Sequence, residues 1–333
     1  DASAAAHRKM VRMQEAGIDV NAQTVFYGNN NPPVGGDTTT GLSTLGRRLD
    51  ACEGTSVRIA PEICIIERAL TYGLQDLADF FREMIEDYGD HPRWLRYRGK
   101  RVVFLWNPFD DGNGPADRFG PDQLEEVWRL LGEDLRESLY VINETYYMVT
   151  RDNDYVAEHW NEDGYVDRML EVVDNLFWWY GWPDPETERF RAGLLAETLR
   201  EKTDEPIIAG IRPGYYRKNT GILNPHGVTA KFRGLWEANM SIDPDWVYFY
   251  SWDDYSENGQ IEPTRFNRGA YSALAQAMTA AWKGETASLP PEQWIGYPLS
   301  LVRGQELRIE SILLAPPSAW SQVVYAFEDA AGR

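Results

Sequence analysis

Two carboxylic acids, Asp254 and Glu257, lie three residues apart in the segment Ser251-Trp-Asp-Asp-Tyr-Ser-Glu257. The segment follows the most apolar strand-like run of the chain and places Trp252 and Tyr255 beside the two acids. Carboxyl groups held close together next to aromatic rings repel each other and lose solvation, so the pKa of one of them rises. One acid can then donate a proton near neutral pH while the other stays ionised, as cleavage of a glycosidic bond requires. The alternative is that Asp254 caps a turn and Glu257 is solvated, as acidic loop residues usually are.

Further polar and aromatic residues stand where predicted strands end. Acids, amides and aromatic rings dominate these positions, whereas histidine and cysteine are almost missing. Such side chains bind sugar hydroxyls and stack on the apolar faces of sugar rings. We predict that the substrate-binding residues are Glu62, Asn107, Glu144, Trp178, Trp179, Tyr180, Tyr215, Tyr216, Trp252, Tyr255 and Glu262.

Several of these positions also fit structural roles. For carboxylates and amides at strand ends, such as Glu62 and Glu144, a hydrogen-bonded structural role fits equally well. Because side chains alternate along a strand, at least one of Trp178 and Trp179 should point into packing. A glutamate in the setting of Glu262, followed by proline, more often fixes a loop than reacts.

Other chemistries lack their sequence patterns in this chain. It has 4 His and no H-x-x-x-H or Cys/His cluster, so we expect no metal site. It also has no G-x-S-x-G motif, which disfavours a serine hydrolase, and we expect no cofactor. Cys52 and Cys64 could pair in a secreted protein, but Cys64 lies in an apolar run where a buried free thiol is more common.

The segments that must position these residues alternate between short apolar runs and longer amphipathic stretches. We expect strands at 18–27, 56–60, 101–106, 139–143, 172–179, 206–211 and 246–252, with helices between them. This alternation predicts an α/β fold in which helices cover a parallel sheet.

About seven β/α units are visible, one fewer than a (β/α)8 TIM barrel needs. The chain starts on the helix that would follow the first strand, so we predict such a barrel with its first strand missing from the start of the chain. An open doubly wound sheet is the alternative, and the lack of a Gly-rich phosphate loop weakens it.

The character of the sequence changes near residue 285. Leu289-Pro-Pro-Glu292 is typical of a linker, and the stretches 306–313 and 320–327 alternate like antiparallel strands. We therefore expect a catalytic barrel at 1–284 and, at 285–333, a linker with the start of a short β-rich accessory module.

Charge and composition exclude some partners. The 333 residues carry a formal net charge of −19, which disfavours binding to nucleic acid. No stretch approaches the roughly 20 apolar residues that a membrane span needs. The 13 Trp and 18 Tyr fit stacking on sugars, and they fit equally well as the aromatic filler of a large core.

The segment from Ser251 to Pro263 resembles the W-N-E-W-x-E-G-T-x-I-E-P signature of glycoside hydrolase family 99, the endo-α-mannosidases and endo-mannanases. It is also similar to the W-N-D-Y-G-E-S segment of the α-1,3-glucanases of family 71. Shorter matching fragments occur in the expected order and extend the resemblance over about residues 5–283: Glu15–Asp19, His91–Leu95, Arg98–Phe104 and Arg212–Tyr216.

This resemblance implies a (β/α)8 fold and cleavage within α-linked glycans. It implies that Glu257 is the general acid/base and that Asp254 assists the substrate's own 2-hydroxyl. The chain departs from the signature at Asp253, where the family has asparagine, and at Asn258, which is inserted between the second acid and the glycine. These departures leave the sugar, the linkage and the stereochemical outcome open.

The residues and the resemblance together predict an endo-acting glycoside hydrolase whose partner is an oligosaccharide or polysaccharide. A role in carbohydrate metabolism and polysaccharide degradation predicts a secreted, periplasmic or cell-surface protein. No signal peptide is visible, and the abrupt start on a helix is typical of a processed or trimmed chain. The alternatives are a non-catalytic glycan-binding protein on the same scaffold and an unrelated barrel enzyme, such as a lyase.

Overall fold

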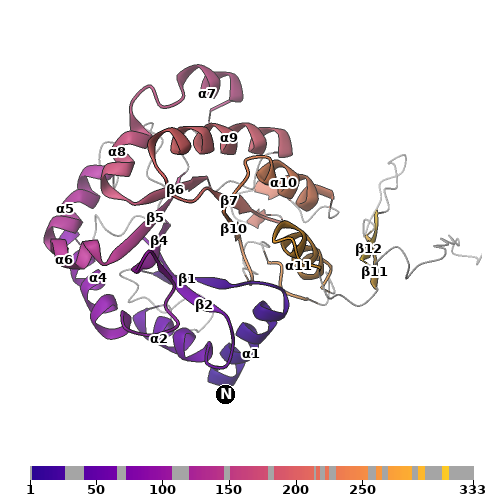
Figure 1. Ribbon diagram of the computed structural model, residues 1–333, viewed down its shortest axis with the longest axis horizontal. Helices are drawn as coiled ribbons and strands as arrows, with labels where there is room; N and C mark the ends of the chain where they lie inside the picture. Colours follow the sequence, from indigo (N-terminus) through magenta and orange to yellow (C-terminus); the bar gives the residue numbers. More distant parts are fainter. Residues whose placement is uncertain are drawn as a thin grey trace, which may run out of the picture.

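In the computed structural model, parallel strands curl into a barrel wall and helices surround it (Figure 1). The structure describes residues 2–26, 41–65, 73–106, 120–145, 151–178, 184–213, 215–217, 222–224, 230–253, 260–264, 269–286, 292–296 and 310–314. The predicted α/β fold is confirmed. It is a mostly parallel sheet with helices outside.

Seven parallel strands of the described residues form the wall, and their order in the barrel follows the chain. They are β1 (Val20–Phe26), β2 (Arg58–Cys64), β4 (Lys100–Trp106), β5 (Leu139–Thr145), β6 (Asn175–Trp178), β7 (Ile208–Ile211) and β10 (Trp246–Phe249). Hydrogen bonds join β1-β2-β4-β5-β6 in this order, and β7 pairs with β10. The short β3 (Arg96–Tyr97) is added antiparallel to β4.

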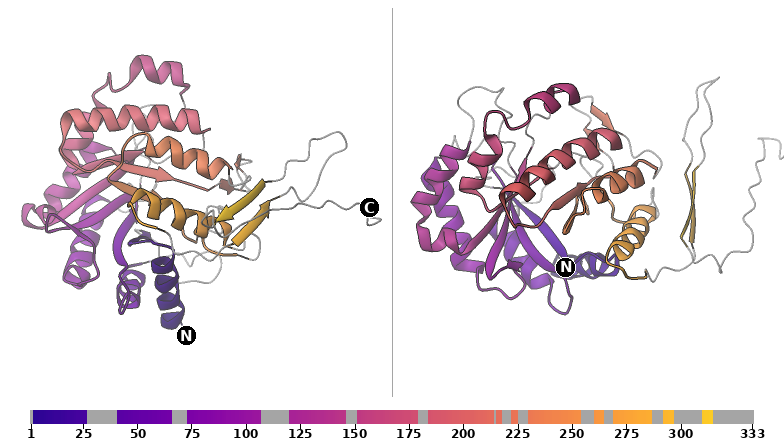
Figure 2. Two further views of the ribbon diagram at one scale, coloured as in Figure 1. Left: turned by 45° about the vertical axis from the view of Figure 1, so that its right-hand side comes forward. Right: turned by 45° about the horizontal axis from the view of Figure 1, so that its top comes forward.

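Helices connect successive strands and surround the wall (Figures 1 and 2). They are α1 (Ala2–Glu15), α2 (Leu42–Ala51), α4 (Leu74–Tyr88), α5 (Pro121–Leu131), α6 (Glu133–Glu137), α7 (Asn153–His159), α8 (Tyr165–Val172), α9 (Pro185–Lys202), α10 (Ala230–Met240) and α11 (Ala270–Trp282). Most of them place apolar residues toward the sheet, as Leu45 and Leu49 of α2 do, whereas α7 lies on the outer side of α9. Within the described residues, no helix has the length and apolar character needed to cross a membrane.

The pleat of the strands divides the apolar residues into two layers. The inner layer fills the barrel and includes Val102, Phe104 and Phe177. The outer layer lies between the strands and the helices and includes Val103 and Leu105, the residues that alternate with the inner ones on β4. This alternation decides which strand-end side chains can reach the interior.

The wall is open between β1 and β10. In the described part of the chain β1 pairs only with β2, and β10 pairs only with β7. A cavity of about 890 Å³ occupies the opening, and Met13 of α1 and Trp282 of α11 line its outer side. Since α1 leads into β1, this is the position where a strand preceding α1 would lie in a right-handed barrel. The closed eight-stranded barrel stays a prediction.

Two antiparallel hairpins lie outside the wall. β8 (Tyr215–Arg217) pairs with β9 (Ile222–Asn224) after β7. Beside α11, β11 (Glu292–Gly296) pairs with β12 (Glu310–Leu314) (Figure 2). β12 overlaps the strand expected at 306–313, but its partner is β11, and the stretch 320–327 lies outside the described residues. The division at residue 285 stays a prediction.

The two cysteines are buried and not bonded to each other. Cys64 ends β2, as expected for a thiol in an apolar strand. Burial raises the pKa of the Cys52 thiol to about 11, so it stays protonated and unreactive near neutral pH.

The opening between β1 and β10 predicts that some backbone amides of β1 are less protected from hydrogen exchange than others. Arg58 N–H donates to Asp19 C=O (3.0 Å), and in this register the amides of Ala22 and Thr24 point away from β2, toward the cavity. We expect these two amides to exchange with solvent orders of magnitude faster than those of β4, which is paired on both sides. Hydrogen–deuterium exchange read by NMR measures this. Equal protection of β1 and β4 would show that the edge is covered.

Candidate functional site

Polar side chains from separate strands meet inside the barrel near the C-terminal ends of the strands. Glu62 lies near the end of β2, Glu144 near the end of β5, and Arg212 directly after β7. All three are almost fully buried, with Glu62 1 % and Glu144 0 % exposed. The strand pleat brings Glu62 onto the inner face with Ala60, while Ile59 and Ile63 pack toward the helices.

Glu62 receives two hydrogen bonds from hydroxyl groups. Thr24 Oγ1 of β1 donates to Glu62 Oε2 (2.6 Å), and the Tyr248 hydroxyl of β10 donates to Oε1. Burial raises the pKa of the Glu62 carboxyl, and the two hydroxyl donors act in the opposite direction. Burial also raises the pKa of Tyr248 well above its ordinary value, so its hydroxyl remains a donor.

Glu144 has the opposite environment. No donor from another described residue reaches either carboxyl oxygen of Glu144, and its hydrogen bond is to the Glu62 carboxyl, to which a protonated Glu144 donates. Burial raises its pKa well above the ordinary value, repulsion from Glu62 raises it further, and the charge of Arg212 opposes both effects. Because Glu62 has two donors and Glu144 has none, we assign the negative charge of this pair to Glu62 and the retained proton to Glu144.

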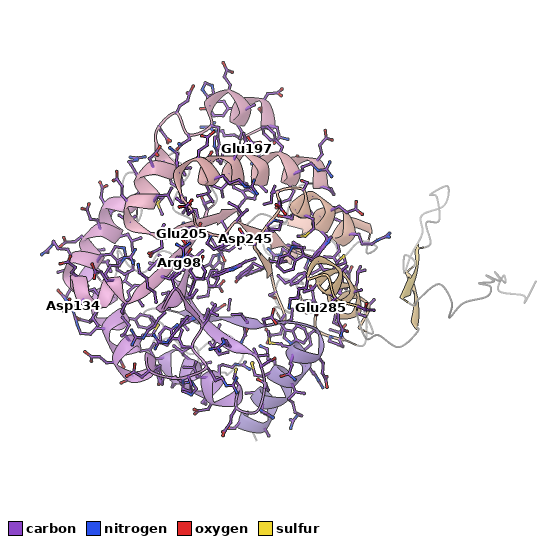
Figure 3. The ribbon with its side chains drawn as sticks, in the orientation of Figure 1. Arg98, Asp134, Glu197, Glu205, Asp245 and Glu285 are labelled. Carbon is purple, nitrogen blue, oxygen red and sulfur yellow. The ribbon has the colours of Figure 1, made fainter. Side chains whose placement is uncertain are left out.

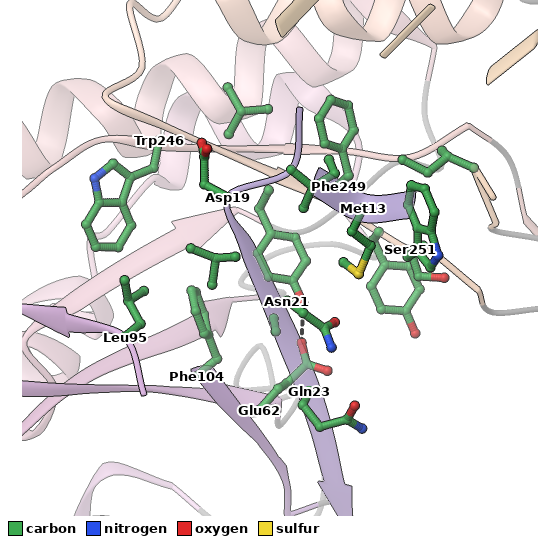
Figure 4. A pocket seen from close by; sticks show the side chains of 18 of the residues that line it. Met13, Asp19, Asn21, Gln23, Glu62, Leu95, Phe104, Trp246, Phe249 and Ser251 are labelled. Carbon is green, nitrogen blue, oxygen red and sulfur yellow. Dashed lines mark hydrogen bonds between the residues drawn. The ribbon is translucent and has the colours of Figure 1, made fainter. Parts of the chain in front are cut away.

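The cavity between β1 and β10 extends to this pair. Glu62 lines it together with Phe104, while Asp19 and Trp246 lie toward its other end (Figure 4). Two buried donors also line the cavity and have no hydrogen-bond partner in the described part of the chain, namely Asn21 Nδ2 and Trp252 Nε1. Buried donors of this kind normally have a partner, and among the described residues these two lack one at the opening of the wall.

The opposite end of the barrel has a different, structural set of contacts. The Tyr140 hydroxyl donates to Glu205 Oε2 (2.8 Å), and Arg98 Nη1 lies 2.6 Å from Glu205 Oε1. Figure 3 shows Arg98 and Glu205 next to each other at the centre of the view. The described residues contain no group of three His, Cys, Asp or Glu that could hold a metal ion.

The segment after β10 is fixed on both of its sides. Ile261 N–H donates to Ser251 C=O (3.0 Å), and Glu262 N–H donates to Trp252 C=O (2.9 Å). Lys9 of α1 forms an ion pair with Asp253, the residue after Trp252. The predicted catalytic residues Asp254 and Glu257 lie outside the described residues.

The predicted substrate-binding residues divide into three groups. Glu62, Glu144, Trp178, Trp252 and Glu262 are described with their side chains. Tyr215 and Tyr216 are described only as backbone of β8. Asn107, Trp179, Tyr180 and Tyr255 lie outside the described residues.

The structure brings some of the first group together and separates others. Glu62 and Trp252 line one cavity, and Glu144 lies close enough to Glu62 to raise its own pKa. Trp178 is 2 % exposed and packs in the outer layer, with Arg191 of α9 over its ring. It therefore occupies the packing position expected for at least one of the two neighbouring tryptophans. Glu262 accepts from Arg12 and adjoins the base of the segment after β10.

Sequence reasoning missed several polar residues of the site. Tyr248 and Thr24 carry a readable signal, because each lies at an inward position of its strand near the C-terminal end. Arg212 belongs to the fragment that supported the resemblance. It is buried, and its charge opposes the rise in the pKa of Glu144. No sequence pattern indicates the contact between Lys9 and Asp253, which are 244 residues apart.

No family model matches this chain. The curated glucan endo-1,3-alpha-glucosidase of Schizosaccharomyces pombe is 22% identical over 190 residues, which cover 55% of this chain and 40% of that protein. This chain thus corresponds to less than half the length of that relative.

Solved structures match over most of the chain. The GH99 endo-alpha-mannosidase from Bacteroides thetaiotaomicron, in complex with bis-tris propane, aligns with a TM-score of 0.63 and 12% identity, covering 85% of this chain and 84% of that one. A second structure of the GH99 endo-alpha-mannosidase from this organism gives 0.61 and 11%, covering 85% and 80%. This chain shares the fold of these two structures. The resemblance to families 99 and 71 predicted from the sequence is confirmed by both comparisons.

The buried glutamate pair predicts a pH-dependent effect of Glu144→Gln, which is neutral at every pH. The raised pKa makes the folded protein bind more protons than the unfolded chain above the ordinary Glu pKa, so wild-type stability falls as pH rises through that window. We expect the melting temperature of E144Q relative to wild type to be lowest near about pH 4 and to increase toward about pH 8. Thermal unfolding followed by circular dichroism measures it. A difference independent of pH would mean that Glu144 is not the group that keeps the proton.

Proposed function

We propose that this chain is the catalytic domain of a glycoside hydrolase that cleaves α-linked glycans at internal bonds. The observation that carries the proposal is the buried Glu62–Glu144 pair near the C-terminal ends of the strands, where barrel enzymes hold their active sites. The GH99 fold and the glucanase-like sequence support the same reaction class. The segment with Asp254 and Glu257 begins at this end of β10.

In the proposed reaction, Glu257 donates a proton to the leaving glycosidic oxygen as the bond between that oxygen and the anomeric carbon breaks. Asp254 accepts the proton of the substrate's 2-hydroxyl as the oxygen of that hydroxyl bonds to the anomeric carbon. A water molecule then adds to the anomeric carbon and gives a proton to Glu257, while the bond to the 2-oxygen breaks and this oxygen takes its proton back from Asp254. No redox step or cofactor is required.

The described residues supply binding groups for the sugar in this proposal. The Glu62 carboxylate accepts hydrogen bonds from sugar hydroxyls, in competition with Thr24 and Tyr248. The predicted residues outside the described ranges, such as Tyr180 and Tyr255, complete the binding surface in the same proposal.

A neutral glycan fits the electrostatics better than an anionic one. The chain has a formal net charge of −19, and carboxyl groups line the proposed site. The names of the relatives point to two neutral polymers, an α-mannan and an α-1,3-glucan. Degradation of such polymers places the protein outside the cell or at its surface, which is part of the proposal.

Replacing Glu257 tests the catalytic assignment. We expect Glu257→Gln to lower release of oligosaccharides from α-mannan or α-1,3-glucan by about 100-fold or more, because Gln cannot donate the proton, while glycan binding is kept. Chromatography of the released products measures turnover, and calorimetry measures binding. Glu285→Gln is the control, since Glu285 is an exposed acid after α11 (Figure 3). Wild-type turnover in E257Q would exclude Glu257 as the acid.

The same screen separates hydrolysis from the alternatives. Affinity of the wild-type protein for either polymer without released product would support a non-catalytic glycan-binding protein. An unsaturated product that absorbs ultraviolet light would reveal a lyase.

Replacing Tyr248 tests whether Glu62 binds substrate as an anion. Tyr248→Phe removes one of the two donors to Glu62, which favours the protonated carboxyl and weakens its hydrogen bonds to sugar hydroxyls. We expect Y248F to raise KM by about tenfold. Tyr140→Phe is the matched control, because it also removes a buried hydroxyl donor to a glutamate, at the other end of the barrel. Equal KM values for Y248F and Y140F would remove Glu62 from the binding site.

A further inference from the structure

Helix α1 contacts the residues on both sides of residues 254–259, the segment that carries the proposed catalytic acids. Lys9 Nζ donates to Asp253 Oδ2, on the residue that precedes Asp254. Arg12 Nη1 donates to Glu262 Oε1 (3.2 Å), shortly after the segment ends. Lys9 and Arg12 are three residues apart, which places both on one face of α1.

The base of this segment is also closed by its own backbone. The hydrogen bonds from Ile261 N–H to Ser251 C=O and from Glu262 N–H to Trp252 C=O bring its two sides together at the end of β10. Ile261 is fully buried and belongs to the outer core. Asp253 and Glu262, which flank the segment, therefore lie near each other, and both contact α1.

The pair between Lys9 and Asp253 is the stronger of the two contacts. The Lys9 side chain is only 12 % exposed, whereas Arg12 is 57 % exposed. Burial lowers the pKa of Lys9, the charge of Asp253 raises it, and Arg48 of α2 lowers it again. A buried ammonium group is unfavourable unless a carboxylate accepts from it, so Lys9 holds Asp253 close. The Arg12–Glu262 pair combines an exposed guanidinium with a carboxylate that is 11 % exposed, and its longer N···O distance of 3.2 Å makes it the weaker contact.

We propose that Lys9 and Arg12 are positioning residues, which anchor the segment carrying Asp254 and Glu257 to α1. The anchoring follows from the described contacts alone, and its catalytic consequence rests on the proposed function. Asp253 stands where the signature that this segment resembles has an uncharged asparagine, which could accept a hydrogen bond from Lys9 but could not form the ion pair. The segment would then be oriented by a helix near the other end of the sequence.

The central variant is Lys9→Met, which keeps the length of the side chain and removes its charge. We expect K9M to lower kcat on the cleaved α-glycan by about 10- to 100-fold with a smaller change in KM, because the acids are misplaced rather than removed. The matched control is Lys283→Met. Lys283 pairs with Asp19 (2.6 Å) and lines the same cavity at the opposite end, away from the segment. Equal kcat for K9M and K283M would overturn the proposal.

A second measurement, deuterium exchange, tests directly whether Lys9 holds the base of the segment in place. The amides of Ile261 and Glu262 close the base of the segment, so we expect them to exchange with deuterium faster in K9M than in wild type or K283M. A merely structural role for Lys9 would raise exchange throughout the barrel, including β4. Unchanged exchange at Ile261 and Glu262 in K9M would also overturn the proposal.

Coupling between the partners completes the test. Asp253→Ala should lower kcat as K9M does, and the double variant should be no slower than either single variant, because all three lose the same contact. Losses that multiply would show that Lys9 and Asp253 act separately, against the proposal. Lys9→Arg, which keeps the charge, should recover most of the lost kcat and covers the case in which K9M fails to fold. Arg12→Gln should have a smaller effect than K9M, in line with its exposure.

Failure of this inference can be told apart from failure of the proposed function. If wild type releases no product from any α-glycan, the proposed hydrolase is wrong, while the exchange of Ile261 and Glu262 still decides whether Lys9 anchors the segment. If wild type is active and K9M matches K283M in both readouts, only the anchoring is wrong.

Discussion

The strands of the barrel wall all run in one direction, and this constraint decides where the chemistry of the chain can lie. Parallel strands bring their C-terminal ends to one rim, and the pleat turns every second residue at that rim inward. Glu62, Glu144 and Tyr248 occupy such positions on strands far apart in the sequence. A polar side chain there cannot reach outside solvent, so it must find a partner in the interior or hold a ligand.

The two buried glutamates differ in the hydrogen-bond donors that the interior provides. Glu62 has two hydroxyl donors, whereas among the described residues Glu144 has only the Glu62 carboxyl as a hydrogen-bond partner. Full ionisation of both would place two negative charges together without water, so the pair retains a proton. An arrangement that lowers stability as pH rises has no obvious structural benefit, which is typical of residues kept for binding or catalysis.

Much of this fold was predictable from the sequence, because strand and helix periods are local properties. The alternation of elements, the inward acids at 62 and 144 and the buried thiol of Cys64 follow from patterns within single segments. The partners of these residues do not. Tyr248 lies 186 residues from Glu62, and only closure of the wall brings them into contact. Likewise, alternation at 306–313 marks a strand, β12, but does not say that it joins β11.

Two features that seem separate meet at α1. Met13 of this helix lines the opening between β1 and β10, and Lys9, one turn earlier, lines the same cavity and holds Asp253. Under the anchoring proposal, the helix that borders the opening of the wall also orients the segment that carries the proposed acids. Lys9 and Met13 lie about one turn apart on α1, so a shift of this helix would move the lining of the opening and the contact with Asp253 together.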